Sequence, residues 1–283
     1  MKRVALVDAD GAEFPFDGSD GVWLGRGWEQ IVAPPFEVDT DPAVGRQGNV
    51  LRRVRVVERD VELPVLVAAR TREQLRDRLR TLTRAANPRR GDARLRVTHD
   101  DGSEVDLVGR VAEVVASGGD GNESHQPATL VFRAFDPYWR GDEVVREYQV
   151  SAPDFFTEGD GFPLQLAGAT IIVTVSEDNI GDADAWPVWT IRGPGTPRIE
   201  RPDDGAVIEF DDLTLAEGET LTIDTEPGVK TVELDGESVY DQLTLESSLF
   251  ALSPGVNTLD VDLDDGTDES LVRLRYRPRS IAP

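Results

Sequence analysis

Apolar and polar residues alternate along residues 61–68 in the manner of a β-strand. One face of this segment consists of Val61, Leu63, Val65 and Val67. A period of two is the geometry of an extended chain whose side chains point to opposite faces. Pro64 stands within the segment and has no backbone N–H to donate, so we expect this strand to lie at a sheet edge or to carry a bulge.

An amphipathic helix is predicted next, over residues 72–86. Its apolar positions recur at helical spacing and are Leu75, Leu79, Leu82 and Ala86. Arginines occupy most of the other positions, as on a helix with one face in water. Thr71 is the expected N-cap, because Gln74 follows it by three residues as in a capping box. Asn87-Pro88 ends the helix, since proline excludes the preceding residue from the helical region.

Extended segments flank this strand and helix. They are predicted at residues 2–7, 12–16, 21–25, 51–58, 93–99, 105–108, 110–116 and 128–135. Residues 33–50 are rich in Pro, Gly and Asp and predict a long loop, which is a type of segment that often forms an interface. The first half of the chain is therefore predicted to be a helix packed on an antiparallel sheet.

The pattern changes after Asp142, where helical periodicity ends. Short apolar runs separated by Gly, Pro and Asp turns predict strands at residues 144–150, 169–175, 188–192, 206–210, 220–224, 230–234, 242–245, 259–263 and 271–276. Short strands with regular turns are typical of an antiparallel β-sandwich. We therefore predict a mainly β protein with two domains, residues 1–145 with helix 72–86 and residues 146–283.

The formal net charge of −24 is concentrated in the second domain. Residues 1–150 carry a net charge of −4, and residues 151–283 carry −20. This acidity argues against sequence-specific binding to nucleic acid, which requires basic side chains at the phosphates. Aspartate is abundant and lysine nearly absent, with only Lys2 and Lys230. Two explanations stay open: a halophilic host, whose salt screens such charge, and a GC-rich genome that replaces lysine by arginine.

Residue types needed for catalysis or metal binding are scarce. The chain has no cysteine, and its two histidines, His99 and His125, stand apart. Neither a zinc site nor a Ser-His-Asp triad is therefore predicted. A run that begins at Asp260 fails the calcium-loop pattern, because Asp265 and Leu271 stand where Gly and Glu are required. We expect no enzyme activity and no cofactor.

The apolar runs are too short for a signal peptide or a membrane helix. We therefore expect synthesis in the cytoplasm, without an export signal and without membrane insertion. Trp186 and Trp189 flank Pro187 ahead of a predicted strand. Aromatic side chains on a β-sandwich either fill the core or stack on sugar rings, and the second role would make this pair a contact site for glycan or for a partner protein.

Several segments occur together in a definite order. They are Leu63-Pro64-Val65, the helix at 72–86, the hairpin around Gly102, the strand that ends in Asp136-Pro137-Tyr138-Trp139, and residues 218–225, 230–236 and 247–259. In this order they resemble the distal tail proteins of long-tailed phages and related prokaryotic viruses, the siphovirus tail-component family often called Dit. The resemblance extends over nearly the whole chain.

The resemblance implies an N-terminal split-barrel-like β domain with one α-helix and a C-terminal galectin-like β-sandwich. It implies a hexameric ring at the tail tip of the virion, between the tail tube protein and the tail-tip or baseplate hub protein. The tape-measure protein and then DNA would pass through the ring. The C-terminal domains would point outward, where they can carry receptor-binding or side-fibre proteins. The resemblance implies no catalytic residues.

A ring requires surfaces that pair between subunits. We place them on the predicted loop 33–50 and on the arginine-rich strand that follows it. The interface candidates are Pro34, Pro35, Arg46, Arg52, Arg53 and Arg55. Two other function classes stay open: a carbohydrate-binding β-sandwich adhesin that contacts the host surface, and a hydrolase, which no residue pattern favours.

The acidic composition generates a test of its own. If the second domain is adapted to concentrated salt, its melting temperature should rise clearly between low salt and molar KCl, because added ions screen the repulsion between its carboxylates. Thermal unfolding followed by circular dichroism measures this change. A melting temperature that does not respond to salt would leave the GC-rich genome as the explanation.

Overall fold

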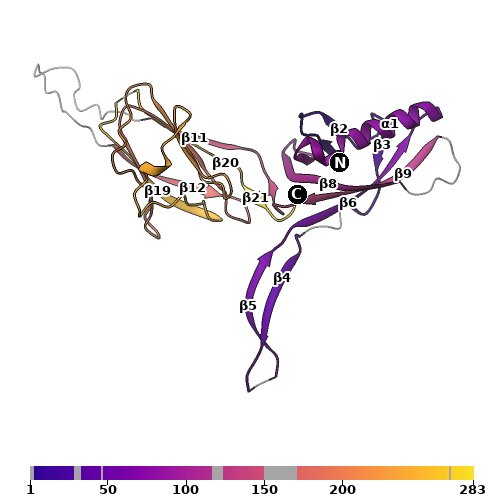
Figure 1. Cartoon of the computed structure of the whole chain (residues 1–283), viewed down its shortest axis with the longest axis horizontal. Helices are drawn as coiled ribbons and strands as arrows, with labels where there is room; N and C mark the ends of the chain where they lie inside the picture. Colours follow the sequence, from indigo (N-terminus) through magenta and orange to yellow (C-terminus); the bar gives the residue numbers. More distant parts are fainter. Residues whose placement is uncertain (1–2, 29–32, 46, 117–123, 150–170, 268) are drawn as a thin grey trace, which may run out of the picture. The chain divides into compact units, whose positions relative to one another are not determined.

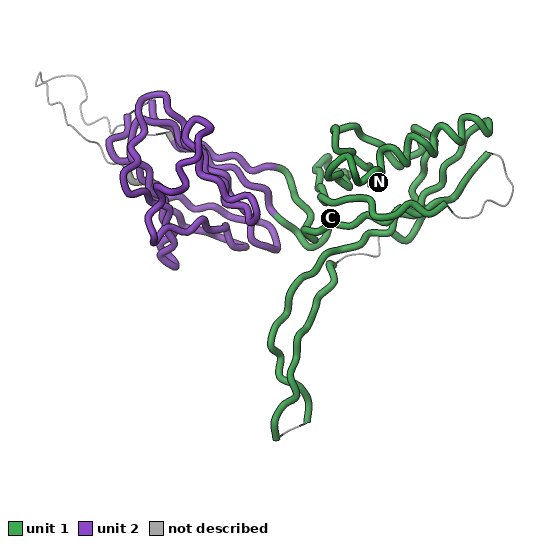
Figure 2. Tube along the Cα trace, in the orientation of Figure 1, with its two compact units in different colours: residues 1–142, 279–283 green, residues 143–278 purple. Residues whose placement is uncertain are grey.

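The computed structural model describes residues 3–28, 33–45, 47–116, 124–149, 171–267 and 269–283. The chain forms two compact units, Met1–Asp142 with Arg279–Pro283 (unit 1) and Glu143–Pro278 (unit 2) (Figure 2). The last residues of the chain thus return to unit 1, which the sequence did not indicate.

Unit 1 is a β structure with the single α-helix α1 among its described residues (Figure 1). Its elements are β1 (Arg3–Val7), β2 (Glu13–Pro15), β3 (Val22–Leu24), β4 (Phe36–Pro42), β5 (Asn49–Val56), β6 (Arg59–Ala68), α1 (Arg72–Ala85), β7 (Ala93–Thr98), β8 (Glu104–Ala116), β9 (His125–Ala134), β10 (Trp139–Arg140) and β21 (Arg279–Ser280). The predicted strands 105–108 and 110–116 are one strand, β8, which continues through a bulge near Val111.

The main sheet of unit 1 is antiparallel and has the strand order β2-β1-β7-β8-β9-β6-β3. Its two ends meet at Phe16, whose N–H donates to the Val4 carbonyl (2.9 Å) and whose carbonyl accepts from the Leu24 N–H (2.9 Å). The sheet is therefore nearly closed, in the manner of a barrel. Alternate residues of each strand point inward and form one apolar core, which includes Leu6, Leu63, Leu95, Leu107, Leu130 and Phe132.

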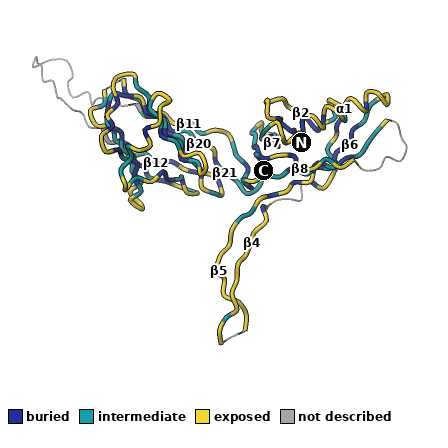
Figure 3. The backbone as a smooth tube through the Cα atoms, viewed as in Figure 1, coloured by how far each residue is buried: buried dark blue, intermediate teal, exposed yellow. Residues whose placement is uncertain are grey.

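Helix α1 forms as the sequence predicts. The Thr71 hydroxyl accepts a hydrogen bond from the Gln74 N–H (3.2 Å) and caps the helix. Leu75 and Leu82 are buried in the core of unit 1, and the side chains opposite them are exposed (Figure 3). The helix ends at Ala85, one residue before the predicted end.

The expectation that the Pro64 strand lies at an edge or carries a bulge is wrong, because β6 lies between β9 and β3 and pairs with both without a register shift. The pairing of β3 with β6 stops at Leu24 and Val65, one residue short of Pro64. The Pro64 carbonyl accepts from the Gly25 N–H (2.6 Å). Since the N and C=O of one strand residue point to the same side, the missing N–H faces the place where β3 has ended.

The prediction of a loop at 33–50 is also wrong, because residues 36–42 form β4 and pair with β5 in an antiparallel hairpin. All described residues of β4 are exposed, and β5 is exposed except at Val56 (Figure 3). Proline, glycine and aspartate obscured this strand in the sequence, although Phe36, Val38 and Thr40 do alternate with acidic residues.

Unit 2 is a sandwich of two antiparallel sheets, with orders β11-β20-β13-β16-β17-β18 and β12-β19-β14-β15. The strands are β11 (Val144–Gln149), β12 (Ile171–Asn179), β13 (Val188–Arg192), β14 (Thr196–Arg201), β15 (Ala206–Ile208), β16 (Thr220–Asp224), β17 (Thr231–Leu234), β18 (Glu237–Ser238), β19 (Gly255–Asp264) and β20 (Leu271–Tyr276). Both sheets contribute to one core, with Ile191 and Leu274 from the first and Ile199 and Leu259 from the second.

In unit 2 one predicted strand is not formed, and the strands β14 and β18 were not predicted. Pro194 and Pro197 gave the β14 segment the composition of a loop. The predicted strand at 242–245 is not formed, and Leu243 makes only an isolated bridge to Phe210. Among the described residues, no helix has the length and the apolar character to cross a membrane.

A buried carboxylate joins the two sheets of unit 2. Glu177 of β12 accepts hydrogen bonds from Tyr148 Oη of β11 (2.6 Å) and from Tyr276 Oη of β20 (3.5 Å). Arg146 Nε lies 3.3 Å from the same carboxylate. Burial and the carboxylate together raise the pKa of Tyr148, so this hydroxyl stays protonated and donates.

Removing this carboxylate should destabilise the sandwich. In Glu177→Ala the Tyr148 hydroxyl loses its acceptor, while Tyr276 Oη keeps the Asp178 carbonyl (3.2 Å), and we expect the free energy of unfolding to fall by about 2–3 kcal/mol. The control Glu217→Ala removes an exposed carboxylate and should change it by less than about 0.5 kcal/mol. Urea denaturation of the full chain measures both. Equal changes in the two variants would contradict a stabilising role for Glu177.

Candidate subunit-interface surfaces

The β4–β5 hairpin carries a row of acids facing a row of arginines. Its register places Glu37 opposite Arg55 and Asp39 opposite Arg53. The Glu37 and Arg55 side chains form an ion pair and are both exposed. Pairs that are exposed to water contribute little stability, typically about 0–1 kcal/mol. Their main effect is to fix which residues of the two strands face each other.

Arg52 is the extra residue at a bulge in the hairpin. The partners of Asp39 and Thr40 are Arg53 and Leu51, so Arg52 has no partner in the ladder. Its Nε lies 2.5 Å from Asp41 Oδ2. A bulge bends and twists a ribbon, and here it leaves an arginine at the bend.

The opposite face of the hairpin is apolar and exposed. The register pairs Phe36 with Val56 and Val38 with Val54, which puts these side chains on one face. Phe36, Val38 and Val54 remain 53%, 54% and 51% exposed. Two strands alone bury too little surface to be stable in water, and an exposed apolar strip of this kind makes the hairpin a candidate for contact with another protein.

The sequence-predicted interface residues lie partly on this hairpin. Arg52, Arg53 and Arg55 are together on β5, and all are exposed. Pro34 is buried just before β4, and the Pro35 carbonyl accepts from the Val57 N–H (3.1 Å), which closes the base of the hairpin. Arg46 lies outside the described residues. The sequence therefore indicated the arginine-rich strand of this hairpin, but not the exposed apolar residues on its other face.

Arg59, where the hairpin joins the barrel, is a residue that sequence reasoning missed. It is fully buried, and its Nη2 donates to the Ile281 carbonyl (2.6 Å) while Nε and Nη1 have no partner. Burial lowers its pKa. The sequence did contain a signal for its burial. Arg59 is two residues before Val61 and four before Leu63, so in a strand its side chain points to the same inward face as theirs. This contact ties the C-terminal residues to the root of the hairpin.

A second tie holds the same C-terminal segment. Trp139 pairs with Ser280 and Arg140 with Arg279 in the ladder between β10 and β21. The Asp136 carboxylate accepts from Arg279 Nη2 (2.5 Å) and from Arg140 Nη2 (3.2 Å). The guanidinium of Arg279 also stacks on the ring of Tyr138, at 4.5 Å from its centroid.

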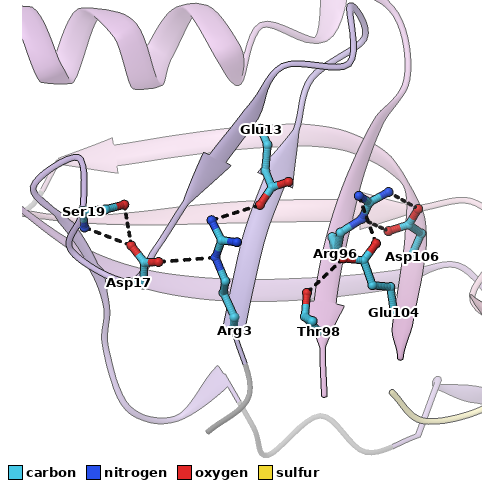
Figure 4. Close-up of polar contacts among 8 residues, drawn as sticks. All are labelled: Arg3, Glu13, Asp17, Ser19, Arg96, Thr98, Glu104 and Asp106. Atoms are coloured by element: carbon cyan, nitrogen blue, oxygen red, sulfur yellow. Dashed lines mark hydrogen bonds and ion pairs between the residues drawn. The ribbon is translucent and has the colours of Figure 1, made fainter. Parts of the chain in front are cut away.

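Other polar groups of the barrel are arranged as ion pairs (Figure 4). Arg96 Nε and Nη2 donate to the two oxygens of Asp106 (2.9 and 3.0 Å), and Arg96 also lies 3.1 Å from Glu104. Arg3 lies between Glu13 and Asp17, at 3.3 Å from each. Hydrogen bonds from Ser19 lower the pKa of Asp17. Each of these carboxylates is thus a partner of an arginine.

A cavity of about 380 Å³ lies beside α1, with Phe14, Phe16, Val22, Arg78 and Leu82 in its wall. The Arg78 guanidinium donates to the Ala68 carbonyl. Ser19 also lines the cavity, and its hydroxyl donates to the Asp17 carboxylate (2.6 Å), which Arg3 Nε contacts at 3.3 Å. In the part of the chain that the structure describes, no group of three or more His, Asp or Glu side chains could hold a metal ion.

The two candidate tryptophans of unit 2 differ in exposure. Trp189 is fully buried between the sheets, so its ring presents no surface to a sugar and fills the core. Trp186 is half-buried. The two rings therefore do not form one exposed surface. The burial of Trp189 favours the interpretation that its ring fills the core.

Two comparisons with known proteins give matches, one to the second half of the chain and one to nearly the whole chain. Residues 180–279 match the family described as siphovirus-type tail component, C-terminal domain (SPP1 Dit). No curated protein matches the chain. The crystal structure of the SPP1 Dit protein, described as a paradigm of hub adsorption apparatus in Gram-positive infecting phages, is similar with a TM-score of 0.64 and 16% identity, over 98% of each chain.

Chains of the phage P2 baseplate are also similar. In the activated conformation with Ca, the TM-score is 0.52 with 10% identity, and 95% of this chain and 99% of that chain are covered. In the activated conformation with Sr, the TM-score is 0.51 with the same identity and coverage. At these identities the likeness shows the fold. The predicted resemblance to the distal tail (Dit) proteins of the siphovirus tail-component family is thus confirmed, by the family match over residues 180–279 and by the shared fold over nearly the whole chain.

Proposed function

We propose that this chain is a structural virion protein, a distal tail component that forms a ring between the tail tube and the host-recognition apparatus. The family match and the fold support a role in the tail or baseplate of a phage. The observation that carries the ring is the β4–β5 hairpin, whose apolar side chains Phe36, Val38 and Val54 are exposed in the part of unit 1 that the structure describes. The matched proteins are structural, and we propose no enzyme activity and no cofactor.

The hairpin serves as the arm that reaches a neighbouring subunit. Its apolar face, with Phe36, Val38 and Val54, packs on the next copy, while the charged face keeps the two strands in register. An arm that binds a different surface on its neighbour makes a head-to-tail contact, and such contacts close into a ring when the rotation between subunits allows it. We propose six subunits, with the tape-measure protein and DNA passing through the lumen.

Unit 2 is the part that contacts other virion components. We propose that it is galectin-like and carries receptor-binding or side-fibre proteins, while unit 1 contacts the tail tube protein and the hub protein. The protein is made in the host cytoplasm and assembles at the tail tip. The two strand segments that connect the units, after Asp142 and before Arg279, fit a module attached to a ring.

Removing the apolar face of the arm should abolish the ring. Phe36→Thr, Val38→Thr and Val54→Thr in one chain keep residues that favour strands but remove the apolar strip. We expect the wild type to elute as a ring and this variant as a monomer, by size-exclusion chromatography with light scattering. Because the replaced side chains are exposed, the melting temperature should fall by no more than a few °C, about what 1 kcal/mol would cost.

A control changes an exposed ion pair outside the hairpin. Asp92→Asn with Arg110→Gln removes such a pair and should leave ring formation intact. Negative-stain images of the wild type should show rings. Rings that persist in the triple threonine variant, or a wild type that stays monomeric at all concentrations, would contradict the proposal.

A further inference from the structure

Helix α1 carries a stripe of exposed arginines, Arg76, Arg80 and Arg84, referred to below as the α1 stripe. They recur every four residues on the side of the helix away from the buried Leu75 and Leu82. Four residues of helix rise by about 6 Å, so the three charges form a row with that spacing. None of the three forms an ion pair with another described residue.

Paired arginines are common elsewhere in unit 1. Arginines with a carboxylate within 4 Å include Arg3, Arg52, Arg55, Arg90, Arg96, Arg110 and Arg133. No ion pair joins the α1 stripe to a described residue, although the exposed Glu73 and Asp77 lie on the same side of the helix, in a chain whose net charge is −24.

Unit 2 carries an acidic row of similar spacing. Asp260, Asp262 and Asp264 alternate along β19 with the buried Leu259, Val261 and Leu263, so they share the face that points away from the core. Alternate strand residues are about 6.6–6.8 Å apart. We refer to these three aspartates as the β19 row.

Within its own unit the β19 row is poorly neutralised. Arg198 of β14 lies 3.6 Å from Asp262 Oδ2, but it also contacts Glu200 (2.5 Å) and Glu209 (3.6 Å). Asp262 Oδ1 is buried without a hydrogen-bond partner. Burial, together with the charges of Asp260 and Asp264, raises the pKa of Asp262. A basic surface placed over this row would relieve the repulsion.

We propose that the α1 stripe of one copy docks on the β19 row of a second copy. Three positive charges at about 6 Å intervals meet three negative charges at about 6.7 Å intervals, and opposite charges in register select one partner and one orientation. Each copy brings both surfaces, so the contact repeats around an assembly. It is separate from the hairpin contact proposed above and uses none of the hairpin residues.

Nucleic acid is the competing occupant of the stripe. A phosphate backbone also attracts a row of arginines. The strongly negative charge of the whole chain opposes its approach, whereas the β19 row is an acidic partner of matched spacing on every copy. The structure therefore favours the second copy.

Crosslinking tests the contact directly, because the chain has no cysteine and each introduced thiol is unique. Full-length Arg80→Cys and Asp264→Cys chains with different tags are co-expressed and treated with a short bismaleimide. We expect a crosslinked heterodimer, with a yield that falls at least tenfold in molar NaCl. The control pairs Arg80→Cys with Glu237→Cys, an exposed position on β18 of the other sheet, and should give little product.

Charge reversal provides the second measurement. Arg76→Glu with Arg84→Glu, added to the Arg80→Cys chain, should abolish the crosslink. Asp260→Lys with Asp262→Lys, added to the Asp264→Cys chain, should restore it. Melting temperatures show that each variant folds. Ring mass, which tests the hairpin, is recorded on the same samples, so failure of one contact is distinguishable from failure of the other.

Three outcomes would overturn the proposal. The first is a crosslink yield equal to that of the Glu237→Cys control. The second is a chain carrying both Arg80→Cys and Asp264→Cys that crosslinks only within itself on dilution. The third is a short DNA duplex that binds the wild type and loses at least tenfold in affinity with the reversed stripe, while no heterodimer forms.

Discussion

The apolar face of the β4–β5 hairpin is the constraint on which the proposed assembly depends. A two-stranded ribbon is one layer thick and has no second layer to cover its apolar side chains. Phe36, Val38 and Val54 therefore face water as long as the chain is alone. On the charged face of the hairpin, acidic side chains form ion pairs with arginines of the other strand. Only the apolar face therefore lacks contacts that would remove its side chains from water. In the proposed assembly, the surface of a neighbouring subunit buries these apolar side chains.

The barrel gives this arm a fixed root. Strand β5 of the hairpin ends at Val56, and β6 begins two residues later, at Arg59. Strand β6 lies inside the nearly closed sheet, between β9 and β3. Arg59 at this junction is buried and holds the Ile281 carbonyl, while Asp136 holds Arg279. Because a buried arginine with few partners is costly, its position implies that the surrounding contacts fix the C-terminal strand beside the root of the arm.

Much of the barrel was predictable because its signals are local. Thr71 and Gln74 set the start of α1, and the alternation of Val61 to Val67 set β6. The sequence did not reveal which strands lie next to each other in the sheets. Pro64 indicated an edge, yet β6 is internal because β3 ends before reaching that residue. Pro197 hid β14, and the proline, glycine and aspartate residues around β4 hid that strand, although Phe36 and Val38 alternate with acidic residues there.

Some residues of the candidate surfaces could be predicted from the sequence, and others required the structure. Arg52, Arg53 and Arg55 could be located from the sequence as an arginine-rich strand next to a Pro- and Gly-rich segment. The role of Phe36 and Val38 required the register that places them together. Trp189, which the sequence left between core and surface, is buried, and no single-chain pattern distinguishes these two fates for an aromatic residue on a strand.

Hydrogen–deuterium exchange of residues 36–56 in the assembled and dissociated protein is the most direct measurement of the central claim. If another copy covers the hairpin, its amides should exchange rapidly in the monomer and become protected on assembly, to a degree comparable with the core strands β6 and β9. An assembled ring in which these amides exchange as fast as in the monomer would contradict the account.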